Sequence, residues 1–198
     1  MSKEVTDRTT GFFKKNLETM DREKRFEYLN RKLRGIVQYA YRHSIAVKEK
    51  MDSVGLKPKD IRTAKDLEKL PITKKADLME LQKKNPPFGG FEGTPIHKLR
   101  RIYVSPGPLY EPGEIEYDEL GWAQGMYAAG FRSGDIAINT FSYHMVPFAL
   151  EMVDNSLLRT GCITIPTGVG NTELQVNILK NLKVDAFCGT PSFLLNIA

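Results

Sequence analysis

Cysteine, histidine and long apolar runs are scarce in this sequence, and each scarcity argues against a class of protein. Its two cysteines, Cys162 and Cys188, stand 26 residues apart, and only three histidines are present. Neither a disulfide scaffold nor a structural zinc site is expected from so few ligands. No apolar run approaches the roughly 18 residues that span a bilayer, and the charged N-terminus lacks the apolar segment of a secretory signal. These absences predict a cytoplasmic protein with reduced thiols and no membrane partner.

Basic residues are in excess, and they are concentrated in the first half of the chain. The 198 residues include 29 Lys and Arg against 24 Asp and Glu, a formal net charge of +5. Residues 1–100 carry a net +10, however, and residues 101–198 a net −5. Hydrophobic residues make up 41% of the chain, which is enough for the packed core of one domain or slightly more.

The basic half raises the hypothesis of nucleic-acid binding, since Lys and Arg gain affinity by neutralising phosphates. Its positive residues alternate with acidic ones, as in residues 21–27, which is typical of the solvated face of an amphipathic helix. The sequence shows no zinc-finger spacing, RNA-binding signature or basic region followed by heptads. A solvated helical surface is the favoured interpretation, and no nucleic-acid partner is expected.

The first half is predicted to be a helical N-terminal portion over residues 1–100. Apolar spacing predicts one long helix or two short ones over residues 22–54, ending at Gly55. A short helix is expected over residues 60–70, and a further one over 74–82 with Thr73 as its N-cap. The two prolines and two glycines of residues 85–90 predict a loop.

The second half has the pattern of an α/β domain over residues 101–198, incomplete at its C-terminus. Four β-prone runs occur, at residues 101–104, 136–139, 162–166 and 184–188. Helical patterns separate them, at residues 114–129, 146–160 and 172–182. This alternation predicts βαβ units and a mostly parallel sheet. Ligands of such sheets bind outside the carboxyl ends of the strands, which here selects the loops 105–113, 140–148, 166–171 and 189–192.

Several short segments, in their order and spacing, resemble the phenylacetate–coenzyme A ligase branch of the adenylate-forming enzymes. These segments are residues 33–41, 55–56, 60–62, 66–67, 70–78, 161–166 and 189–195. No single segment is specific, but together they cover almost the whole chain. The resemblance implies the N-terminal portion of such an enzyme, in which helices precede a partial, mostly parallel sheet.

The resemblance also implies an activity in two steps. A carboxylate attacks the α-phosphorus of ATP to give an acyl-adenylate and pyrophosphate, and the thiol of coenzyme A then displaces AMP. ATP, Mg²⁺ and coenzyme A are the implied cofactors, because charge must be neutralised as pyrophosphate leaves. The implied partner is a small-molecule carboxylate, aryl or related, and a homodimer is left open.

The family's phosphate loop, rich in Ser, Thr and Gly and bearing a lysine, corresponds to residues 105–112 and is altered here. Ser105 and Gly107 remain as candidate nucleotide contacts. Pro106 and Pro108 each lack the backbone N–H that could face a phosphate, and Glu111 stands where a lysine is expected. Two interpretations stay open for this segment: a weakened ATP loop, and a proline-stiffened turn that binds no ligand.

The turn after the third strand supplies the other nucleotide candidates. Gly168, Gly170 and Thr172 resemble the family's glycine-rich turn at this place. The alternative is a plain strand-to-helix turn in which Thr172 caps the following helix.

Three residues are candidates for substrate binding by the same resemblance. Tyr143 follows the second parallel strand, where relatives present aromatic residues to an aryl acid; the alternative is a tyrosine that packs under a loop. Lys74 matches a family lysine near the substrate entrance, or is a surface lysine at a helix start. His144 is a candidate base or pocket wall, although a lone histidine is more often structural.

The sequence provides no candidate catalytic or metal-binding residue. The family's acidic magnesium segment, its ribose-binding aspartate and its mobile C-terminal domain with a catalytic lysine all lie beyond position 198 in the pattern. We therefore hypothesise a part of an acid–coenzyme A ligase that is inactive alone, either a fragment or a natural short protein. The alternative hypothesis is a non-catalytic binding or interaction module on the same scaffold.

Overall fold

The computed structural model describes residues 7–113 and 121–198, which group into two compact units. The sheet unit comprises residues 7–18 and 121–198, and the helical unit comprises residues 19–113. The helical unit is thus inserted in the chain between two parts of the sheet unit. This grouping differs from the boundary at 100/101 suggested by composition, because contacts join the first residues to the sheet and the segment 101–113 to the helices.

The helical unit begins with two consecutive helices, one of the two arrangements predicted for residues 22–54. These are α2 (Arg22–His43) and α3 (Ile45–Ser53). Asp21 caps α2 by accepting a hydrogen bond from the Lys24 amide, and Ser44 separates the helices and caps α3 through the Val47 amide. Their core contains Val37, Met51 and Ile61, with Leu33, Tyr41, Val47, Leu56 and Leu70 packed against it.

The remaining helices of this unit differ in detail from the prediction. They are the 3₁₀ turns η1 (Pro58–Asp60), η2 (Ala64–Lys69) and η3 (Ile96–Lys98) and the α-helix α4 (Lys75–Lys84). Lys74 rather than Thr73 occupies the N-cap position of α4. The Thr73 hydroxyl accepts a hydrogen bond from the Lys50 ammonium instead, so the predicted capping by Thr73 is wrong.

A β-hairpin completes the helical unit. Its strands, β1 (Arg101–Ser105) and β2 (Leu109–Gly113), pair antiparallel, with Tyr103 opposite Glu111. The prediction that all of residues 105–113 form a loop is wrong, and β1 is not part of the parallel sheet. The prolines of this segment favour a loop over a strand, so the sequence did not predict β2. Pro112 is tolerated there because a two-stranded hairpin has free edges on which a missing N–H costs little.

The sheet unit contains the predicted parallel sheet. Its strands are β3 (Ile136–Asn139), β4 (Ile163–Pro166) and β5 (Ala186–Cys188), in the order β4-β3-β5. Both pairings are parallel, and Ala137 of the central strand lies between Thr164 and Ala186. The α/β fold class is therefore confirmed. Ile163 is 58% exposed, because β4 is an edge strand of the described sheet.

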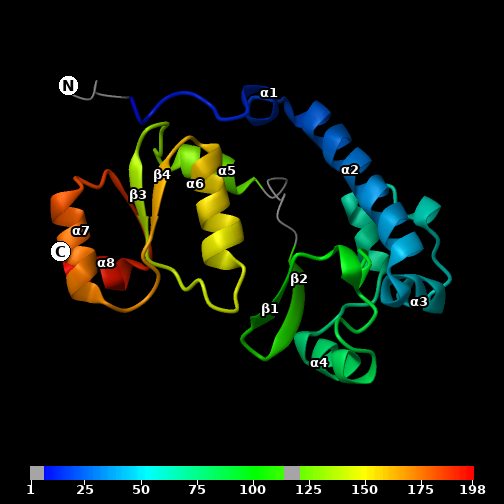
Figure 1. Ribbon diagram of the computed structural model, residues 1–198. Coiled ribbons are helices and arrows are strands. Elements are labelled where there is room, and N and C mark those ends of the chain that lie inside the picture. The colour runs from blue at the N-terminus through cyan, green and yellow to red at the C-terminus, as the bar shows by residue number, and fades with distance from the viewer. Residues whose placement is uncertain (1–6, 114–120) are drawn as a thin grey trace. The chain divides into compact units, whose positions relative to one another are not determined.

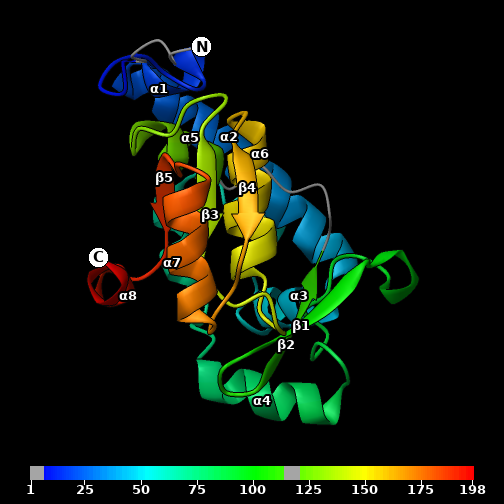
Figure 2. The same cartoon turned by 60° about the vertical axis from the view of Figure 1, so that its left-hand side comes forward.

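Helices cover both faces of this sheet (Figures 1 and 2). The helices of this unit are α1 (Lys15–Glu18), α5 (Trp122–Ala128), the π-helical turn η4 (Phe148–Asp154) with its continuation α6 (Asn155–Arg159), α7 (Thr172–Asn181) and α8 (Pro191–Ile197). Both views place α5 and α6 on one face and α7 on the other. The predicted helix over 114–129 is observed in its second part; Glu114 and Glu116 lie outside the described residues.

Both cysteines lie in the core of the sheet unit. The core joins Phe131, Ala137, Val153 and Leu157 to Cys162 and Cys188. Burial raises the pKa of the Cys188 thiol to about 12 and also raises the pKa of Cys162. Because the thiolate is the reactive form, these thiols act as small apolar core residues.

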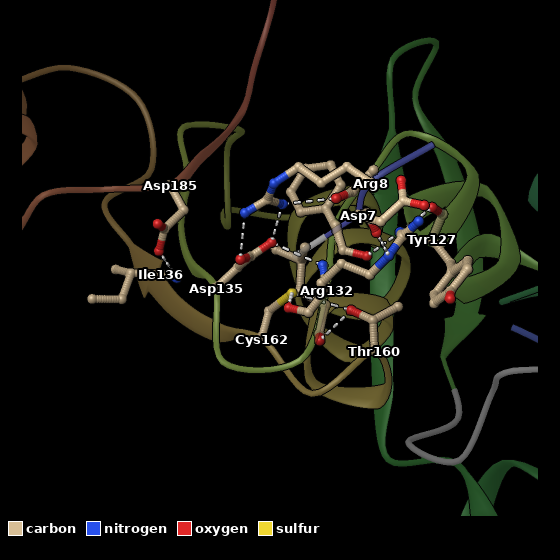
Figure 3. A network of polar contacts seen from close by, with 12 residues as sticks. Asp7, Arg8, Tyr127, Arg132, Asp135, Ile136, Thr160, Cys162 and Asp185 are labelled. Atoms are coloured by element: carbon tan, nitrogen blue, oxygen red, sulfur yellow. Dashed lines mark hydrogen bonds and ion pairs between the residues drawn. The ribbon is translucent and has the colours of Figure 1, made fainter. Parts of the chain in front are cut away.

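A polar clamp fastens residues 7–10 to the turn that precedes β3 (Figure 3). Arg8 donates two hydrogen bonds to the Asp135 carboxylate, of 2.6 and 2.8 Å, and the Asp135 side chain is only 5% exposed. Arg132 donates to the carbonyl oxygens of Asp7 and Thr10, at 3.2 and 3.0 Å. Bidentate contacts between charged groups are among the strongest hydrogen bonds in proteins, so the clamp closes the sheet unit across more than a hundred residues of sequence.

We expect the core of the sheet unit to distinguish two neighbouring leucines. Leu157 is fully buried, whereas Leu158 is 57% exposed. Leu157→Ala should lower the free energy of unfolding by about 2–5 kcal/mol, because it leaves a cavity. Leu158→Ala should change it by about 0.5 kcal/mol or less. Urea unfolding followed by the fluorescence of Trp122, the single tryptophan, measures both. Equal losses would contradict the described packing.

The clamp predicts a dependence of stability on pH. Burial alone would raise the pKa of Asp135, but hydrogen bonds from Arg8 and the Arg132 amide leave it below its ordinary value of 3.8. A lowered carboxyl pKa adds stability above that value, and the contribution is lost as the pH falls through the folded-state pKa. Arg8→Gln should cost about 1–3 kcal/mol at pH 7, and the difference from the parent should shrink below pH ~3. The matched control is Lys180→Gln, and urea midpoints at both pH values are the measurement.

Candidate functional site

A pocket of about 250 Å³ lies where the three parallel strands end. Its lining comes from the segments that follow them: Thr140, Phe141, Ser142, Val169, Gly170, Thr190 and Phe193. Parallel strands bring their carboxyl ends to one edge of a sheet, and ligands bind there in α/β folds. Three of the four predicted loops, 140–148, 166–171 and 189–192, therefore meet as expected. The fourth, 105–113, belongs to the helical unit.

The ends of the strands are held together by backbone and hydroxyl groups. The amide and the hydroxyl of Thr140 both donate to the Cys188 carbonyl at 2.9 Å. The Gly168 amide and the Thr167 hydroxyl both donate to the Asn139 carbonyl at 3.1 Å. Gly189 is required by close approach, because a Cβ there would overlap the Thr140 hydroxyl and the Phe187 ring. The pocket is thus largely formed before any ligand binds.

Asn139, which the sequence analysis did not single out, organises the pocket. It is completely buried. Its side-chain amide donates to the Ala149 carbonyl at 3.0 Å and to Asp154 Oδ1 at 2.8 Å, and its Oδ1 accepts the Phe141 amide at 3.1 Å. The side-chain bonds connect β3 to η4 and to the loop after β3. The backbone carbonyl of Asn139 connects β3 to the loop after β4. The sequence feature that could have indicated Asn139 is a polar residue at the carboxyl end of an apolar strand.

Tyr143 lies beside the pocket, and its hydroxyl is already committed. The hydroxyl donates to Asp154 Oδ2 at 2.7 Å, while Thr164 donates to the other oxygen of Asp154 at 2.9 Å. Burial and the neighbouring Asp154 carboxylate raise the pKa of Tyr143 well above its usual value, so the phenol stays protonated. Its ring faces Gly168, where a Cβ would lie 3.5 Å away. Tyr143 therefore supports the pocket wall, and Phe141 is the aromatic residue that lines it.

The glycine-rich turn after β4 has the backbone that its sequence suggested. Gly168 and Gly170 have φ angles of +68° and +82°, a region that favours glycine, and Gly170 lines the pocket. Thr172 is the first residue of α7, and Asn171 occupies the N-cap position. The predicted capping by Thr172 is therefore wrong. Gln175, which is buried, donates to the Gly168 carbonyl at 2.7 Å and holds the turn in place; it is not among the residues predicted from the sequence.

The remaining substrate candidates do not line the pocket. His144 is exposed, and its backbone amide donates to the Ser142 hydroxyl at 3.3 Å. Lys74 is exposed at the start of α4 in the helical unit. Among the predicted site residues of the sheet unit, Gly170 lines the pocket, and Tyr143 and Gly168 contact each other next to lining residues. Lys74, Ser105 and Gly107 belong to the other unit.

The turn at residues 105–108 does not fit a phosphate group. Pro106 and Pro108 provide no amide N–H, and the nearby Lys75 ammonium donates to the Pro106 carbonyl at 2.7 Å. The Ser105 hydroxyl is buried and has no hydrogen-bond partner within the described residues. Across residues 7–113 and 121–198, no cluster of three or more His, Cys, Asp or Glu could hold a metal ion. The turn at residues 105–108 therefore offers no set of backbone amides for a phosphate.

Solved structures identify the fold class as that of acid–coenzyme A ligases. The chain superposes on 2-hydroxyisobutyryl-CoA ligase with 2-HIB-AMP and CoA in the thioesterification state at a TM-score of 0.81, with 23% identity, over 98% of this chain and 43% of that one. The same ligase with R3-HIB-AMP in the postadenylation state gives a TM-score of 0.79, with 24% identity, over 92% and 40%. At this identity the likeness concerns the fold.

Sequence relatives narrow the class to the phenylacetate–coenzyme A ligases. The enzyme of Aromatoleum evansii is 30% identical over 173 residues, 84% of this chain and 38% of that protein. The enzyme of Thermus thermophilus is 28% identical over 193 residues, 94% and 42%. A scan against protein-family models found no match. These relatives confirm the resemblance seen in the sequence, and the chain spans about two fifths of their length.

We expect Asn139 to control the order of the loop after β3. Asn139→Ala leaves the Phe141 amide without its acceptor and removes one donor from the buried Asp154. Each buried group left unpaired costs about 1–3 kcal/mol. Urea unfolding should report this loss, and hydrogen exchange of the Phe141 amide should accelerate in the native state. Asn177→Ala, at an exposed position of α7, is the control. Unchanged exchange at Phe141 would contradict the assigned role.

Proposed function

We propose that this chain supplies the acyl-binding part of an AMP-forming acid–coenzyme A ligase site. The observation that carries the proposal is the pocket at the carboxyl edge of the sheet, in a chain similar to phenylacetate–coenzyme A ligases along almost its whole length. The relatives and the solved neighbours are named for arylacetate and hydroxyacid substrates. The proposed ligand is accordingly a small carboxylic acid, aryl or branched.

The lining supports a specific mode of binding. Phe141, Val169 and Phe193 provide apolar walls, which would take the hydrocarbon part of the acid. Among the described residues, no charged side chain lines the pocket, and a carboxylate buried without a cation would be strongly unfavourable. The carboxylate therefore stays at the solvent side, within reach of the hydroxyls of Ser142 and Thr190. Tyr143 backs the wall, and direct substrate contacts by His144 and Lys74 remain predictions.

Binding of the nucleotide by this chain is implied only by its relatives. ATP, Mg²⁺ and coenzyme A serve the family's reaction, but the turn at 105–108 does not fit a phosphate, because Pro106 and Pro108 lack an amide N–H. Nucleotide contacts by Gly168, Gly170 and Thr172 remain predictions. We therefore propose that the chain does not complete adenylation by itself.

A second candidate function is a non-catalytic binding or interaction module. The observation in its favour is the altered turn, in which Lys75 is bonded to the Pro106 carbonyl instead of facing an anion. Such a module would keep the scaffold and the pocket without the ligase reaction.

Calorimetric titration tests the proposal directly. Phenylacetate and 2-hydroxyisobutyrate should release heat on binding, whereas ATP and AMP should release none. Val169→Trp fills the pocket with a larger side chain and should weaken acid binding at least about tenfold, since apolar burial dominates such sites. Ile163→Trp is the matched control, because Ile163 is exposed on β4 and does not line the pocket.

Each alternative has its own outcome in these titrations. Absence of binding by every carboxylate would contradict the acyl pocket and favour the interaction module. Heat from ATP would contradict the misfit at residues 105–108. Pyrophosphate release by this chain with ATP, Mg²⁺ and either acid would contradict the proposal that it is inactive alone.

A further inference from the structure

Three large apolar side chains of the long helix α2 are exposed; Figure 1 shows the course of this helix. Phe26, Leu29 and Ile36 are 56%, 55% and 59% exposed. Their spacing places them on one side of the helix, and the buried Val37 lies at the edge of the same side, where it packs into the core of the helical unit. A surface helix ordinarily buries its apolar side, so the part of this side that stays exposed within the described residues, the apolar stripe, indicates a binding surface.

Basic residues are interleaved with this stripe. Arg22, Arg25 and Lys32 are exposed, and each stands four residues before Phe26, Leu29 or Ile36. Residues four apart are neighbours on a helix surface, so each apolar side chain has a cation one turn away. The whole helix carries seven Arg and Lys against two Glu.

The rest of the helical unit reinforces this charge. Residues 19–113 hold 21 Lys and Arg against 12 Asp and Glu, a net +9, whereas the described sheet unit holds seven of each. The positive field therefore belongs to the unit that bears the stripe. Charge complementarity then requires an anionic partner with an apolar layer beneath its charge.

We propose that α2 docks on the surface of an anionic phospholipid bilayer. Phe26, Leu29 and Ile36 enter the boundary of the acyl chains, and Arg22, Arg25 and Lys32 pair with lipid phosphates. Helices of 20–30 residues with a basic polar face and Phe or Leu on the other lie in the interface in this manner. Nucleic acid would use the cations but leave the apolar stripe without a contact, so the stripe favours the bilayer.

This proposal revises the expectation that the chain has no membrane partner. That expectation rested on the absence of a spanning segment, and no helix within residues 7–113 and 121–198 is long and apolar enough to cross a bilayer. Binding at the surface requires only an amphipathic helix and anionic lipid. The docking concerns α2 alone and is independent of the pocket in the sheet unit.

Cosedimentation with vesicles tests the proposal. The chain should bind vesicles of phosphatidylcholine and phosphatidylglycerol, bind pure phosphatidylcholine at least about tenfold more weakly, and dissociate as salt rises to about 0.5 M. The double variant Phe26→Ser/Ile36→Ser should lower binding at least about tenfold. Ile72→Ser is the matched control, since Ile72 is 87% exposed in the same unit but lies outside the stripe. Circular dichroism checks that each variant is folded.

Three outcomes would overturn the proposal. The first is absence of binding to phosphatidylglycerol vesicles. The second is binding that is unaffected by Phe26→Ser/Ile36→Ser, which would indicate attraction to any polyanion, nucleic acid included. The third is an equal loss with Ile72→Ser, which would indicate non-specific adsorption. Preserved binding by Ile72→Ser with loss in the stripe variant supports docking by α2.

Discussion

The structure of the pocket depends on one buried residue at the end of the central strand. Asn139 uses its carbonyl for the loop after β4 and its side chain for η4 and the loop after β3. A buried amide must satisfy its donors and acceptors within the protein, so the positions of these segments are coupled. Parallel pairing of β3 with both neighbours then carries the constraint to the loop after β5, through Thr140 and the Cys188 carbonyl.

Hydrogen bonds within the protein also determine which polar side chains remain available for a ligand. The hydroxyl of Tyr143 and the hydroxyl of Thr164 both donate to Asp154, and the hydroxyl of Thr140 donates to a carbonyl. What faces the cavity is consequently apolar, apart from the hydroxyls of Ser142 and Thr190. This distribution explains why the geometry supports the binding of an acyl group more directly than it supports catalysis.

Local sequence patterns predicted much of this fold, and long-range contacts account for what they missed. The alternation of apolar strands and helices predicted β3, β4 and β5 and the edge at which their loops meet. The strand β2 was missed because Pro112 masks it and its partner determines it. Asn139 and Gln175 act through residues distant in the chain, and the clamp between Arg8 and Asp135 joins positions 127 residues apart. No spacing rule reveals such pairs in a single sequence.

The uneven charge of the chain takes on a different meaning once the two units are distinguished. Composition placed the change near residue 100, whereas the described contacts assign a net +9 to the helical unit and no net charge to the sheet unit. The pocket is thus in the neutral unit, and the described residues that line it include no cation; the acid that we propose as its ligand would be held there by apolar burial. Seven of the cations instead belong to α2, and Lys75 lies beside the altered turn at 105–108. The turn provides no amides for a phosphate, whereas α2 presents its cations beside exposed apolar side chains, so an extended anionic surface is a better match for this charge than a single nucleotide.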